Sequence, residues 1–216
     1  MAYKNNGDME LYKLKDINLN PSNILDIGAN KGQFYNWAKS EWPKSNVYMI
    51  EANEVHDEVL KNLVGDGDDY LIAALGDEDR EVTFYTRKDK PWTEGASYYK
   101  EINYNNEPHL TMKITMRLKR LDDIFDNDTT FELIKLDTQG AELDIIKGGK
   151  ELCKRANVIL LEAAKVPSNE DAPLIDDIMD FMDDFGFEYK FSVGEHYDKN
   201  NVNCQSDLVF INKNIK

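Results

Sequence analysis

The chain has 216 residues with 26 basic and 41 acidic side chains, so its formal net charge at pH 7 is -15. Such a charge repels a phosphate backbone, and no apolar stretch approaches the roughly 20 residues that span a bilayer, so we expect neither nucleic acid nor a membrane as a partner. Two cysteines, an apolar fraction of 41% and an N-terminal segment without an apolar core predict a reduced, cytoplasmic globular protein without a signal peptide.

The length predicts a single domain over residues 1–216, in which residues 1–20 form an N-terminal extension. The first part of this domain alternates strands with helices. Apolar runs at 23–27, 47–50 and 70–75 are typical of buried strands. Between them, two groups of apolar residues recur at helical spacing and predict two helices. The groups are Phe34, Trp37, Ala38 and Trp42, followed by Val55, Val59, Leu60 and Leu63.

The pattern changes in residues 81–118. Residues 81–85 and 111–118 alternate with period 2 around a polar loop, so we predict an inserted antiparallel segment. Its cations indicate either a solvated strand edge or a surface that collects an anionic substrate. Its aromatic side chains suit stacking on a sugar or flat ring, or simply the packing of a long loop. The cations are Arg87, Lys88, Lys90, Lys113, Arg117 and Lys119; the aromatic residues are Trp92, Tyr98, Tyr99 and Tyr104.

Strand and helix patterns alternate again in the rest of the chain. Apolar runs predict strands at 131–136, 157–161, 187–193 and 206–212, the last two joined by a polar loop. Helices are predicted from Ala141 onward and from Leu174 to Phe185. The seven runs outside the insertion therefore predict an α/β fold with a mostly parallel seven-stranded sheet, covered on both faces.

The clearest chemical signal is the segment from Asp26 to Gly32, which joins the first strand to the first helix. Gly28 and Gly32 let the backbone approach a ligand closely, at the positive end of a helix. Glu51 ends the second strand, where its carboxylate can accept hydrogen bonds from both hydroxyls of an adenosine ribose. Because Asn30 replaces the second glycine of a dinucleotide-binding motif, the spacing favours S-adenosylmethionine over a nicotinamide cofactor. The alternative is a tight turn without a ligand.

A second signal follows the strand at 131–136. Asp137 lies where this strand opens onto the same crevice, so it could hold the cofactor's ammonium group, orient a substrate hydroxyl, or be a solvated strand-end carboxylate. Glu142 follows in a first helical turn, where a carboxylate usually complements the helix dipole.

Together these segments resemble the FkbM-type methyltransferases, which are S-adenosylmethionine-dependent O-methyltransferases. The resemblance implies the class I (Rossmann-like) three-layer methyltransferase fold, and a hydroxyl of a sugar or another small molecule as the acceptor. The segments that carry it are 24–34, 48–53, 74–77, 81–85, 120–123, 135–142, 146–149 and 159–162. The cofactor contacts that it implies, together with neighbours in the same segments, are Asp26, Gly28, Ala29, Asn30, Gly32, Glu51, Ala52, Leu75 and Asp137.

At one candidate catalytic position this chain departs from the family. Family members often carry glutamate where this chain has Gln139, which can position a substrate but cannot act as a base. We take Asp137, Glu162 and His196 as catalytic candidates, with His109 as an alternative base; a lone surface histidine is the competing interpretation. Asp137 and Glu162 could hold a divalent ion, but no Asn or Asp follows Glu162 to complete the site, so we expect no metal.

The sequence thus predicts an O-methyltransferase and leaves two alternatives open. The first is a module that binds S-adenosylmethionine without turnover, which Gln139 and the unassigned base would permit. Cofactor binding without methyl transfer would distinguish it. The second is an NAD-dependent oxidoreductase, which stronger binding of a nicotinamide cofactor would indicate. Neither the acceptor nor the oligomeric state can be predicted from the sequence.

Overall fold

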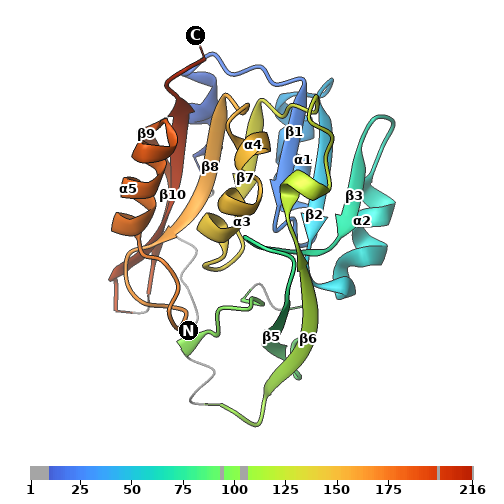
Figure 1. Cartoon of the computed structure of the whole chain (residues 1–216), viewed down its shortest axis with the longest axis vertical. Helices are drawn as coiled ribbons and strands as arrows, with labels where there is room; N and C mark the ends of the chain where they lie inside the picture. The colour runs from blue at the N-terminus through green and yellow to red at the C-terminus, as the bar shows by residue number, and fades with distance from the viewer. Residues whose placement is uncertain (1–9, 93–94, 103–106, 199, 216) are drawn as a thin grey trace.

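Figure 1 presents the computed structural model of the chain, which describes residues 10–92, 95–102, 107–198 and 200–215. Its centre is a seven-stranded sheet with the strand order β3-β2-β1-β7-β8-β10-β9. The strands from β3 to β8 in this order run parallel, while β10 runs antiparallel to both β8 and β9. The predicted seven-stranded, mostly parallel sheet is therefore confirmed.

The bounds of the elements follow the predicted alternation. The strands of the large sheet are β1 (Asn23–Ile27), β2 (Asn46–Glu51), β3 (Asp69–Ile72), β7 (Leu133–Leu136), β8 (Val158–Ala164), β9 (Phe187–Tyr197) and β10 (Asn203–Asn212). The α-helices are α1 (Gln33–Glu41), α2 (Asp57–Leu63), α3 (Glu142–Gly148), α4 (Lys150–Cys153) and α5 (Ile175–Phe185). Short 3-10 helices are η1 (Leu11–Lys15), η2 (Glu54–His56) and η4 (Leu121–Asp123).

Two hydrophobic cores, one on each face of the sheet, hold the helices in place. Successive strand residues alternate between them: Ile24 belongs to the core with η1, α1 and α2, and Leu25 to the core with α3, α4 and α5. Both side chains are fully buried. This alternation is what a sheet covered on both faces requires, and it produces the three-layer arrangement.

The insertion is a small sheet of its own rather than a hairpin alone. It contains β4 (Ala74–Leu75), β5 (Glu81–Arg87) and β6 (Thr111–Lys119) in the order β4-β6-β5, with β4 parallel to β6. The predicted strand at 70–75 is thus divided between the two sheets. Figure 1 shows β5 and β6 projecting beyond the carboxyl ends of β1 and β2.

The loop after β5 fastens the insertion to the large sheet. Ser97 pairs with Tyr85, and its hydroxyl donates to the Thr138 carbonyl oxygen at 3.2 Å. The hydroxyls of Tyr98 and Tyr99 both donate to Asp144 Oδ2, at 3.1 and 2.7 Å. The tyrosine pair therefore packs the loop, as the second interpretation of its aromatic residues predicted, whereas Tyr104 lies outside the described residues.

Two local predictions were wrong. Val55 and Val59 are 44% and 42% exposed, and α2 begins only at Asp57, so this helix is anchored by the buried Leu60 and the partly buried Leu63. Strands β9 and β10 extend into both ends of the segment predicted as a loop, because polar side chains there bind across the strands; Ser206, for example, donates to Glu195 Oε2 at 2.6 Å. Within the described part of the chain, no helix has the length and apolar character needed to cross a membrane.

Candidate active site

A cavity of about 1000 Å³ opens at the carboxyl ends of the parallel strands, beneath the insertion. Its volume is at the upper end of the range for small-molecule sites, enough for a cofactor and an acceptor together. Apart from the alternative base His109, all but two of the residues predicted for the site line this cavity. They are Gly28, Ala29, Asn30, Glu51, Ala52, Leu75, Asp137, Glu162 and His196. The exceptions are Asp26 and Gly32.

The glycines of the first loop are required by chain packing. Gly28 has a φ of +75°, and a Cβ there would lie 1.9 Å from the carbonyl oxygen of Asp137. Gly32 has a φ of +78°, and its Cβ would lie 2.3 Å from Leu63 Cδ1. The prediction that both glycines serve close approach to a ligand was therefore incomplete: they first let β1 and α1 pack against β7 and α2.

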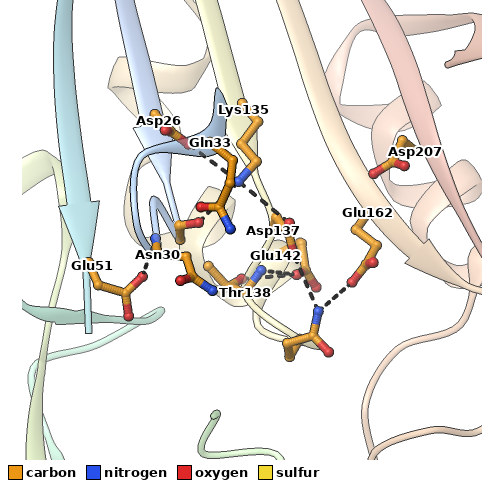
Figure 2. A network of polar contacts seen from close by, with 12 residues as sticks. Asp26, Asn30, Gln33, Glu51, Lys135, Asp137, Thr138, Glu142, Glu162 and Asp207 are labelled. Atoms are coloured by element: carbon orange, nitrogen blue, oxygen red, sulfur yellow. Dashed lines mark hydrogen bonds and ion pairs between the residues drawn. The ribbon is translucent and has the colours of Figure 1, made fainter. Parts of the chain in front are cut away.

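Glu51 fixes the shape of the loop and faces the cavity. Its Oε2 accepts a hydrogen bond from the Asn30 backbone N–H at 2.8 Å (Figure 2). Its Oε1 accepts one from Asn53 N–H at 2.7 Å. Burial raises the pKa of Glu51, and these two bonds oppose the rise. A carboxylate oxygen has further lone pairs, so each oxygen can accept another hydrogen bond from a ligand.

A buried lysine joins the two strand-end acids of β1 and β7. Asp26 and Lys135 are register partners in these strands, so they share one face of the sheet. Lys135 Nζ lies 3.3 Å from Asp26 Oδ1 and 3.5 Å from Asp137 Oδ2, and donates to the Gly28 carbonyl oxygen at 3.1 Å (Figure 2). Burial alone would lower the pKa of Lys135, but Asp26 and Asp137 hold it above its usual value.

Asp26 lies behind the cavity wall. It is fully buried, and within the described residues its oxygens have the Lys135 ion pair but no aligned hydrogen bond. Burial raises its pKa and the lysine charge opposes this. Asp26 was predicted to contact the cofactor; in the structure it does not line the cavity, whereas its ion-pair partner Lys135 does.

Glu142 holds the loop that follows β7. It is 3% exposed, and it accepts hydrogen bonds from Thr138 N–H at 2.6 Å and Gly140 N–H at 3.0 Å. Burial raises its pKa to about 7. The loop that it stabilises presents the side chain of Gln139, whose Nε2 donates to Asp137 Oδ1 at 3.2 Å and to Glu162 Oε2 at 2.7 Å.

A histidine–aspartate pair lies at the other side of Glu162. Asp207 in β10 is the register partner of Glu162 in β8, and His196 extends from the neighbouring strand β9. His196 Nε2 lies 2.8 Å from Asp207 Oδ2, and the hydrogen bond to Asp207 raises the pKa of the imidazole. Burial and the charges of Asp137 and Asp207 raise the pKa of Glu162 well above its usual value. This arrangement can take up a proton beside a bound hydroxyl.

The same cluster is a possible donor set for a metal ion. Ligand atoms of Glu162, His196 and Asp207 all lie within 4.8 Å of one another. Two carboxylates and an imidazole suit several divalent ions. From the sequence, only Asp137 and Glu162 were candidates to share an ion, because Asp207 is distant in sequence and its strand pairing could not be foreseen.

The other two histidines lie in contrasting environments. His56 is buried, lines the cavity, and has its pKa lowered by that burial. His109 is exposed and does not line the cavity, so the structure does not support it as a base.

On the insertion, Arg87 reaches the cavity but is paired with Asp89 and Glu107, at 2.9 and 2.7 Å, which weakens the case for an anionic substrate.

Comparison with known proteins settles the family. Residues 26–189 match the methyltransferase FkbM domain, which covers more than half of the chain. The chain belongs to the FkbM methyltransferase family. This confirms the predicted methyltransferase activity and, with it, S-adenosylmethionine as the cofactor.

Individual relatives of this FkbM methyltransferase are distant. It is 25% identical over 182 residues to the 2-O-methyltransferase NoeI of Sinorhizobium fredii (strain NBRC 101917 / NGR234), covering 79% of this chain and 75% of that protein. The Synechocystis PCC 6803 magnesium protoporphyrin IX methyltransferase ChlM, solved with bound SAM, superimposes with a TM-score of 0.50 at 12% identity, over 93% of this chain and 74% of ChlM.

A second structure, the 1,6-didemethyltoxoflavin-N1-methyltransferase of Burkholderia thailandensis, gives a TM-score of 0.53 at 8% identity, over 95% of this chain and 75% of that one. At these identities the structures confirm the class I fold and nothing more specific.

Proposed function

We propose that this protein transfers a methyl group from S-adenosylmethionine to a hydroxyl of a small molecule, a sugar in particular. The observation that carries the proposal is His196, which is bound to the buried Asp207 and lines the same cavity as the first loop and Glu51. A cofactor site and a base for a hydroxyl are the two things that O-methylation requires. The name of NoeI, a 2-O-methyltransferase, is consistent with a hydroxyl acceptor.

The residues around the cavity fit S-adenosylmethionine. Each Glu51 oxygen keeps a lone pair for a ribose hydroxyl, and the Asp137 carboxylate, held by Lys135, suits the ammonium group of the methionine end. Leu75 and Ala52 add apolar surface for the adenine. When bound, the cofactor supplies an electrophilic methyl group on a sulfonium centre.

His196 would act as the base. Since its Nε2 is bound to Asp207, Nδ1 is the nitrogen left to accept the proton of the acceptor hydroxyl. The Asp207 carboxylate would hold the ring in place and stabilise the imidazolium that forms. Asp137 and Glu162, connected by Gln139, would orient the hydroxyl for in-line transfer.

The part of the cavity lining that includes Gln139 and Glu162 suits a polyhydroxylated acceptor. Amide and carboxyl side chains dominate there, and groups of this kind bind hydroxyls by donating and accepting hydrogen bonds. They are Gln139, Glu162, Asn169 and Gln205. The net charge of -15 makes nucleic acid a poor acceptor, although proteins of this fold include some named for RNA methylation.

Calorimetry and a methyl-transfer assay test the proposal together. We expect S-adenosylmethionine and S-adenosylhomocysteine to bind, and labelled methyl groups to reach members of a panel of sugars and other hydroxylated compounds. His196→Asn should bind the cofactor normally but lose transfer, while His109→Asn, outside the cavity, should keep both. Absence of cofactor binding would refute the proposal. Binding without transfer to any acceptor would favour a module that only binds the cofactor.

A further inference from the structure

Around Asp137 and Glu162, at the end of the cavity proposed for the acceptor, carboxylates outnumber the neighbouring cations. Asp137 follows β7, and Glu162 and Asp207 face each other across β8 and β10. Like charges opposite one another in a sheet repel, and burial makes the repulsion stronger. Lys135 offsets Asp137, and His196 offsets Asp207. Neither of these two cations bridges Asp137 and Glu162.

The amide of Gln139 bridges these two carboxylates. Its Nε2 donates to Asp137 Oδ1 at 3.2 Å and to Glu162 Oε2 at 2.7 Å. An amide nitrogen has two hydrogens, so each of the two acids receives one. The amide therefore occupies the position in which a cation bound by both acids would lie, without adding charge.

The backbone is shaped to bring this side chain into the cavity. Gln139 has a φ of +57°, a left-handed conformation that is unfavourable for a residue with a Cβ. The turn continues through Gly140 at φ +102°, where a Cβ would lie 2.7 Å from that of Ala172. Glu142 accepts hydrogen bonds from the N–H groups on both sides of Gln139. The same turn without the Gln139 bridge would retain its strain and lose this contact.

We propose that Gln139 is a positioning residue whose amide takes the place of a cation between Asp137 and Glu162, and that a carboxylate at position 139 would turn this cluster into a divalent-cation site. The inference rests on the proposed methyl transfer, since Asp137 and Glu162 are to orient the acceptor. With glutamine at position 139, the enzyme works without an added divalent ion. With glutamate, three carboxylates converge and require one.

The test compares Gln139→Glu and Gln139→Ala with the wild type. Asn214→Asp is the charge-matched control, because Asn214 is exposed and does not line the cavity. Manganese binding is measured by calorimetry and by thermal shift, which need no acceptor. We expect manganese to bind to Gln139→Glu at millimolar concentration or below and to stabilise it, but not to bind to the wild type, Gln139→Ala or Asn214→Asp.

Methyl transfer supplies the second readout. Wild-type transfer should be unchanged by EDTA. Gln139→Glu should lose about 10- to 100-fold in kcat in EDTA and regain activity with manganese, and Gln139→Ala should lose kcat similarly without regaining it. Manganese binding by the wild type through Glu162, His196 and Asp207 would overturn the inference. So would a Gln139→Glu variant that binds no manganese, or a Gln139→Ala variant with wild-type kcat. If no protein transfers methyl groups, the proposed function fails, while manganese binding still decides the inference.

Discussion

Glu51 offers the sharpest test of where the cofactor binds. Its two oxygens already accept hydrogen bonds from the backbone of Asn30 and Asn53, and they are the groups expected to accept bonds from the two ribose hydroxyls. Glu51→Ala removes the hydrogen bonds to the backbone and those to the ribose at once. The change therefore has two separable effects, one on cofactor affinity and one on the stability of the free protein.

The size of each effect follows from these bonds. Hydrogen bonds to a charged group are worth about 1.5–3 kcal/mol each, so the two ribose bonds sum to about 3–6 kcal/mol before water replaces part of them. Since about 1.4 kcal/mol is tenfold in affinity, the Kd should rise at least about tenfold. The N–H groups of Asn30 and Asn53 are partly exposed, so their loss of acceptors should cost about 1–2 kcal/mol and leave the fold intact.

Calorimetry with S-adenosylhomocysteine and urea unfolding measure these quantities. Glu54→Ala is the control, because Glu54 is an exposed acid three residues further along that does not line the cavity. It should leave both the Kd and the free energy of unfolding unchanged. An unchanged Kd in Glu51→Ala, with unchanged circular dichroism, would place the ribose elsewhere and refute this part of the site.

Three further predictions concern the charged network. Asp137→Asn should lower turnover by about 10²-fold or more but weaken cofactor binding much less; full activity would exclude a role in transfer, and equal losses would make Asp137 a cofactor anchor only. Asp207 raises the pKa of His196, and the base must be neutral to accept a proton, so wild-type kcat should rise with pH above 6.5. In Asp207→Asn this rise in kcat should move to lower pH, while the maximal rate falls. A pH profile that does not move would contradict the pairing of His196 with Asp207. Lys135→Met leaves Asp26 buried without its cation and should lower the free energy of unfolding, measured in urea, by about 3–5 kcal/mol. Adding Asp26→Asn should recover part of this loss. A Lys135→Met variant as stable as the wild type would contradict the role of the ion pair.

The fold was largely predictable because its strands are apolar and its helices are amphipathic. Runs such as Ile24–Ile27 are buried on both faces, and this is the pattern that sequence periodicity detects. The ends of β9 and β10 were missed because polar side chains pair there through side-chain hydrogen bonds, which hydrophobic periodicity does not register. The start of α2 was misplaced because Val55 and Val59 have helical spacing but face solvent.

That most of the residues predicted for the cofactor line one cavity could also be foreseen, since they lie in continuous segments at strand ends. The acceptor half depends on strand pairing. Asp207 faces Glu162 only because β10 returns antiparallel to β8, and nothing local in the sequence indicates this register. Lys135 could have been found: a lysine within the apolar run 131–136, two residues before an acid, is an unusual charge in a buried strand and calls for a partner.

A crystal structure of the protein with S-adenosylhomocysteine tests the proposed site most directly. We expect both ribose hydroxyls on the Glu51 carboxylate, the amino group of the homocysteine end at Asp137, and the sulfur facing the open side of the cavity lined by His196. A nucleoside bound away from Glu51, or a sulfur turned away from His196 and Glu162, would contradict it.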